Sequence, residues 1–164
     1  MIFVTLGTHE LHFTRLLKEL EGLKKEGKIQ EEVIVQNGNT RFSSDYLQLI
    51  PFMSMEDMET YIKNSSFVIS HAGTGSITTS LKLGKKVIIV PRLQKFNEHN
   101  DDHQLELSET FSRNGYVLPC YEEDRLENVI EQLKTFTPQV FTADNTQMLN
   151  ILENFIEGEK LDAY

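Results

Sequence analysis

A short loop between an apolar segment and a helical segment carries the residue types best suited to chemistry. It runs from His71 to Ser76 and contains Gly73, Thr74 and Gly75. Small residues let a ligand approach the backbone closely, and the start of a helix offers free N–H groups and a positive dipole end. His71 adds a ring N–H donor even when it is neutral. We therefore expect an anion site, for a diphosphate, and the alternative is a glycine turn capped by Thr74 or Ser76.

A second loop of this kind follows the first apolar run of the chain. It reads Gly7-Thr8-His9-Glu10. On its own, Gly-Thr after a strand is equally typical of a tight turn. If both loops follow strands at a topological switch point, however, they would hold a phosphate from two sides.

A third polar segment, from His99 to Gln104, follows a later apolar run. Asp102, His103 and Gln104 fall near the start of a helix, where they could reach the hydroxyls of a sugar or ribose. His99 and His103, spaced i, i+4 beside Asp102, could instead hold zinc on one helix. The surrounding acids suit a hydrated loop equally well, so we predict no metal site.

Phe52 and Met53 lie just after the third apolar run. They suit either core packing or a wall against a flat base.

Strand and helix patterns must position these loops, and they alternate throughout the chain. The expected strands are 2–6, 33–36, 46–50, 67–69, 87–90 and 116–118. The expected helices are 11–25, 54–64, 76–83, 101–113, 122–135 and 146–157. This alternation predicts an α/β fold, a Rossmann-like six-stranded parallel sheet with helices on both faces. Ligands in such sheets bind beyond the carboxyl ends of the strands.

Length and charge narrow the classes of function. The chain has 164 residues, which suits a single domain over 1–157 with a frayed tail at 158–164. A net charge of −9 argues against direct binding to nucleic acid or an anionic membrane. One cysteine, no signal peptide and no membrane-spanning run lead us to expect a cytoplasmic protein without a transmembrane segment of its own.

In this order, the motifs resemble the C-terminal, donor-binding half of glycosyltransferase family 28. The matching segments are Phe3 to Glu10, Ser70 to Ser76, Val90 to Arg92, Glu98-His99 and Asp101 to Gln104. Within this family, the chain resembles the catalytic subunits of bacterial two-part glycosyltransferases of capsule and exopolysaccharide assembly. These are related to the eukaryotic two-subunit UDP-N-acetylglucosamine transferase of dolichol-linked oligosaccharide synthesis.

The resemblance implies one half of a GT-B fold that binds a UDP-sugar, with no other cofactor. Gly73 to Ser76 and His71 would hold the diphosphate, with Gly7 and Thr8 near the phosphates. Phe52 and Met53 would face the uracil, and Gln104, with Asp102 or His103, the sugar or ribose. Many relatives place a glutamate on the ribose where this chain has Thr79, which can make only a single hydroxyl contact.

The implied reaction transfers a hexose to a lipid-linked glycan, with inversion and without a metal. A membrane-anchored partner subunit would bind the acceptor and recruit this chain to the inner face of the cytoplasmic membrane. His9 and Glu10 are candidate general bases, although Glu10 could cap the following helix and the base could belong to the partner. The alternatives are a UDP-sugar epimerase and a non-catalytic nucleotide-binding subunit of a transferase.

Overall fold

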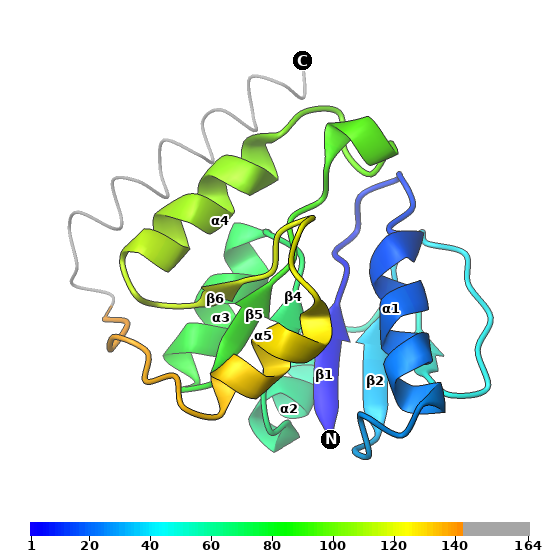
Figure 1. The fold of residues 1–164 in the computed structure, drawn as a ribbon, viewed down its shortest axis with the longest axis horizontal. Helices are drawn as coiled ribbons and strands as arrows, with labels where there is room; N and C mark the ends of the chain where they lie inside the picture. The colour runs from blue at the N-terminus through cyan, green and yellow to red at the C-terminus, as the bar shows by residue number, and fades with distance from the viewer. Residues whose placement is uncertain (143–164) are drawn as a thin grey trace.

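The computed structural model describes residues 1–142, which form a six-stranded parallel sheet in the order β3-β2-β1-β4-β5-β6 (Figure 1). The strands are β1 Ile2–Thr5, β2 Val33–Gln36, β3 Gln48–Ile50, β4 Val68–Ser70, β5 Val87–Ile89 and β6 Leu118–Pro119. Each neighbouring pair is parallel. The predicted sheet is confirmed.

Helices cover both faces of this sheet, as predicted. They are α1 Thr14–Lys25, α2 Met55–Asn64, α3 Thr74–Lys82, α4 His103–Arg113 and α5 Leu126–Leu133, with a 3₁₀ turn at Gln94–Phe96. Helices α1 and α5 pack on one face of the sheet, toward the viewer in Figure 1, and α2, α3 and α4 pack on the other. Alternate residues of each strand enter the two cores: Val4 joins the first and Phe3 the second. No helix within residues 1–142 has the length and apolar character needed to cross a membrane.

The strand order creates a switch point between β1 and β4. From β1 the chain continues to β2 and β3 on one side, whereas β4 leads to β5 and β6 on the other. The loops that follow β1 and β4 therefore leave the same edge of the sheet in diverging directions, which opens a crevice at that edge.

Several element boundaries differ from the sequence prediction, and the largest difference is at α5. This helix begins at Leu126 rather than at residue 122, because Tyr121 and Asp124 bond to each other in a turn that precedes it.

Helix α1 begins late, at Thr14, because the backbone before it is held in a loop. The N–H of Leu11 bonds to His9 Nδ1, and the N–H of Phe13 bonds to the side chain of Thr40, which follows β2. The predicted helix cap by Glu10 is therefore wrong.

Helix α3 begins two residues early, at Thr74, because Gly73 is extended and takes the N-cap position. Strand β6 begins late, at Leu118, because the N–H of Tyr116 still bonds to Phe111 O in the last turn of α4. The predicted helix 146–157 and tail 158–164 lie outside the described residues.

Candidate functional site

A cleft of about 590 Å³ lies beyond the carboxyl ends of β1 and β4. The predicted site residues among those that line it are Gly7, Thr8, His9, His71, Gly73, Thr74, Gly75, Ser76, His103 and Gln104. These residues come from all three predicted loops, which follow β1, β4 and β5. The expectation that the loops share one rim of the sheet is therefore confirmed.

The start of α3 presents free backbone donors to this cleft. Within residues 1–142, the N–H groups of Thr74, Gly75 and Ser76 have no hydrogen-bond acceptor. The alternative of a turn capped by Thr74 or Ser76 is not observed, and within the described region no other side chain caps these N–H groups. Three unpaired N–H groups at the positive end of a helix dipole form an anion site.

The side chain of Gln104 fixes the proton position on His71. Its Oε1 accepts from the N–H groups of Ala72 and Arg92, at 3.2 and 3.0 Å, so the other end of the amide is the NH2 group. That NH2 lies 3.2 Å from His71 Nδ1. Because an NH2 group can only donate, Nδ1 must be unprotonated, and neutral His71 carries its proton on Nε2.

Burial and the nearby charge of Arg92 lower the pKa of His71 to about 3. The ring is therefore neutral at physiological pH and presents an N–H donor.

Two glycines hold the ring of His71 between them. A Cβ atom on Gly7 or on Gly73 would lie 2.5 Å from His71 Nε2, well inside van der Waals contact. Gly7 also has a φ of +74°, which favours glycine on its own account. The position of His71 therefore requires glycine at both positions.

We expect His71 to make the protein less stable in acid. The unfolded ring titrates near 6.5 and the folded ring near 3, so the unfolded chain binds an additional proton between these values. The free energy of unfolding therefore falls as the pH drops through that window, by at most about 2 kcal/mol between pH 7 and pH 5. Urea unfolding at the two pH values should show a smaller difference for His71→Gln.

His12→Gln is the matched control, because His12 lies outside the cleft and its Nδ1 accepts from the N–H of Arg41 on the surface. An unchanged pH slope in His71→Gln would contradict the assignment of a neutral, buried ring.

His9 lies at the mouth of the cleft against His99, with ring centroids 4.5 Å apart. Its Nδ1 accepts from the N–H of Leu11 at 3.0 Å, which places the proton of the neutral ring on Nε2. Burial lowers the pKa of His9, and the charges of His99 and Arg92 lower it further. A base role for His9 requires that Nδ1 be released from Leu11.

The zinc alternative does not have the helical geometry it assumed. His103 is the first residue of α4, whereas His99 precedes the helix, and both lie beside Asp101. Residues 1–142 contain no cluster of three or more side chains arranged to hold a metal ion.

Three predicted site residues lie outside the cleft lining. Asp102 is the residue before α4, and its Oδ1 accepts from the N–H of Gln94 at 3.0 Å. It borders a different hollow. Glu10 is exposed on the loop after β1, and Thr79 lies on α3 beyond the turn that faces the cleft.

The predicted base-binding pair is also outside the cleft lining. Met53 packs against the core on the α2 side, so the core-packing interpretation holds for it, and Phe52 is 58% exposed. Met55 and Met58 of α2 line the cleft instead. The sequence predicted this helix over 54–64, but not which of its residues face the cleft.

The sequence analysis also missed Gln36, a buried polar residue at the end of β2. Its Nε2 donates to Gly7 O and Pro51 O, and its Oε1 accepts from Thr5 Oγ1 at 2.7 Å. It thereby holds the Gly7 loop against the end of β3. A polar side chain that ends an apolar strand was the available signal, at Thr5 as at Gln36.

Comparisons with known proteins agree with this geometry. Residues 1–158 match the glycosyltransferase family 28 C-terminal domain. The "UDP-N-acetylglucosamine transferase subunit ALG13" of Saccharomyces cerevisiae is 31% identical over 119 residues, which cover 66% of this chain and 54% of the yeast protein. The Candida albicans protein of the same name is 28% identical over 109 residues, 66% of this chain and 36% of that protein. This chain therefore spans about half or less of the length of these relatives.

Two solved structures share the fold. An NMR solution structure of ALG13 has a TM-score of 0.53 at 22% identity and covers 92% of this chain and 94% of that one. MurG of Acinetobacter baumannii has a TM-score of 0.52 at 20% identity, covering 80% of this chain and 40% of MurG. The fold is that of one half of a GT-B glycosyltransferase.

Proposed function

Because the chain belongs to the family of glycosyltransferase family 28 C-terminal domains, we propose that it binds a UDP-sugar and takes part in transferring the sugar to an acceptor. One observation carries the proposal. The free N–H groups of Thr74, Gly75 and Ser76 and the Nε2–H of His71 belong to one cleft at the switch point of the sheet. Such an array suits a diphosphate.

In this proposal the same donors act on the leaving group. Negative charge grows on UDP as its bond to the sugar breaks, and oriented N–H groups that need no rearrangement stabilise it. The step requires no metal and no cofactor beyond the donor. Gly7 and Thr8 approach the phosphates from the opposite loop, and Met55 and Met58 supply the apolar wall for the uracil.

We further propose that a partner subunit completes the active site. The relatives are named as subunits of a transferase, which supports a two-part enzyme. In the proposed setting the partner is membrane-anchored, the acceptor is a lipid-linked glycan, and the complex works at the inner face of the cytoplasmic membrane in capsule or exopolysaccharide synthesis. The relatives' name makes UDP-N-acetylglucosamine the first donor to test among the UDP-hexoses.

Calorimetric titration with UDP tests the donor site directly. We expect binding whose affinity is the same with and without EDTA, because the proposed diphosphate ligands are N–H groups of the chain. A chain that does not bind UDP, or binds it only until chelator is added, would contradict the metal-free donor site. UDP-sugars titrated in the same way would rank the possible donors.

A transfer assay separates the proposal from its alternatives. A catalytic subunit should transfer sugar when combined with its partner, whereas an epimerase would convert the donor without an acceptor. A non-catalytic subunit would leave transfer intact when its cleft residues are substituted.

A further inference from the structure

Arg92 is a fully buried cation behind the cleft. Its guanidinium donates to three backbone carbonyl oxygens, Leu6 O at 2.6 Å, Leu11 O at 2.8 Å and Glu98 O at 3.0 Å, and lies over the ring of Phe13. Within residues 1–142 its Nε has no hydrogen-bond partner and it forms no ion pair. A buried charge without a counter-ion is expensive, so it calls for an explanation.

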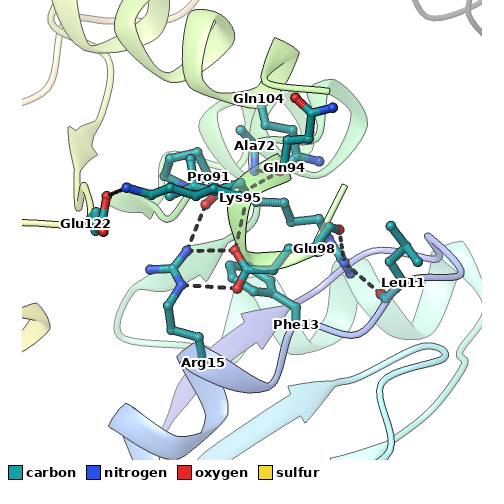
Figure 2. A network of polar contacts seen from close by, with 12 residues as sticks. Leu11, Phe13, Arg15, Ala72, Pro91, Gln94, Lys95, Glu98, Gln104 and Glu122 are labelled. Carbon is teal, nitrogen blue, oxygen red and sulfur yellow. Dashed lines mark hydrogen bonds and ion pairs between the residues drawn. The ribbon is translucent and has the colours of Figure 1, made fainter. Parts of the chain in front are cut away.

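The nearest acidic side chain is already neutralised by another cation. Both oxygens of Glu98 accept from Arg15, at 3.1 Å from Nε and 3.0 Å from the terminal nitrogen (Figure 2). One of them also accepts from the N–H of Leu93 at 3.0 Å. Arg15 also donates to Pro91 O at 3.1 Å. The group formed by Arg15, Glu98 and Arg92, here called the arginine cluster, therefore carries one excess positive charge.

The field of this excess charge reaches the cleft. The backbone N–H of Arg92 bonds to Gln104, which in turn contacts His71, so the segment after β5 that carries Arg92 is joined to the cleft through Gln104. The guanidinium lowers the pKa of both His71 and His9, two residues that line the cleft. Other charged neighbours of His9 are His99, Glu10 and Asp101.

A local positive charge matters here because the chain as a whole is acidic, with a net charge of −9. Surface charge alone would repel a nucleoside diphosphate. A buried charge is poorly screened by solvent and ions, and it acts without moving.

We propose that Arg92 is a fixed buried charge that gives the cleft its preference for a nucleoside diphosphate over the uncharged nucleoside. This inference rests on the proposed function, since it concerns the same donor site. Arg92 acts through space on the bound phosphates and does not contact them. The competing interpretation is that Arg92 only ties the loops after β1 and β5 together through its carbonyl contacts.

The test compares the affinities for UDP and uridine, because uridine lacks the charge that Arg92 would attract. Arg92→Gln is expected to weaken UDP binding about tenfold and to change uridine binding less than about twofold. Arg92→Lys keeps the charge and should restore most of the UDP affinity. An equal loss for both ligands, or no rescue by lysine, would leave only the structural role.

Two variants in the same cluster keep the test decisive if Arg92→Gln does not fold. Glu98→Gln removes the negative charge and should raise the ratio of UDP to uridine affinity, which damage to a loop cannot do. Arg15→Gln, at a partly exposed position, should lower the ratio. Shifts in the same direction, or no shift, would overturn the inference. Absence of UDP binding by the unmodified chain would instead refute the proposed function.

Discussion

Gly73→Ala is expected to weaken UDP binding by about 100-fold, because displacing a positioned group by about 1 Å costs this much. The added Cβ would lie 2.5 Å from His71 Nε2, and Gly73 has an ordinary φ of −101°, so the substitution adds a collision without backbone strain. The ring must leave its contact with Gln104 and enter the space of the ligand. Calorimetry with UDP measures the loss, and urea unfolding should show a cost of about 1–3 kcal/mol to the fold.

Two other glycines, Gly75 and Gly84, provide the controls. A Cβ on Gly75, in the same loop, meets nothing within 4 Å, so Gly75→Ala should not destabilise the fold. Gly84→Ala carries the strain of a φ of +73° far from His71, and it should lower stability without affecting UDP binding.

The collision can also be isolated by a double-mutant cycle. In a His71→Ala background, Gly73→Ala should cost little further affinity, since the ring it displaces is gone. Additive losses in the two variants would show that Gly73 acts independently of His71.

The sequence was sufficient to predict which loops form the site. Apolar runs alternate with helical patterns, and in a parallel sheet the loops after successive strands leave the same edge. The loops at Gly7, His71 and His99 therefore had to meet at one rim, and the structure brings them to one cleft. This part of the prediction depends only on local pattern and on the parallel connection of the strands.

Other parts depend on features that local pattern does not contain. Gln36 reaches the Gly7 loop only because β2 lies beside β1, and strand order is a tertiary property. Asp102 and Gln104 were grouped because they are close in sequence. The helix begins at His103, so Gln104 faces the cleft wall while Asp102 turns to Gln94.

Burial is a second feature that the sequence left undecided. Arg92 follows an apolar strand in a polar segment, where an exposed, ligand-binding arginine is as reasonable as a buried one. The contacts of Arg92 with Leu11 O and with the ring of Phe13, both in the loop after β1, show that its donors are used internally.

His71→Ala is expected to lower kcat/KM for sugar transfer by about 100- to 1,000-fold, the usual cost of removing one oriented donor to a developing anion. The substitution deletes the Nε2–H and leaves the NH2 of Gln104 without its partner. The free N–H groups at the start of α3 remain, so UDP should still bind. Steady-state transfer by the complex with the proposed partner subunit is the measurement.

The division of this loss between binding and kcat distinguishes two roles for His71. A ring that merely fills the space between Gly7 and Gly73 would lower affinity for UDP and for UDP-sugar alike, with kcat preserved. A donor to the leaving group strengthens its hydrogen bond as charge develops, so kcat should fall further than UDP affinity. His12→Ala, outside the cleft, controls for loss of a histidine as such. If transfer survives His71→Ala, the leaving group must be stabilised elsewhere, by the start of α3 alone or by the partner.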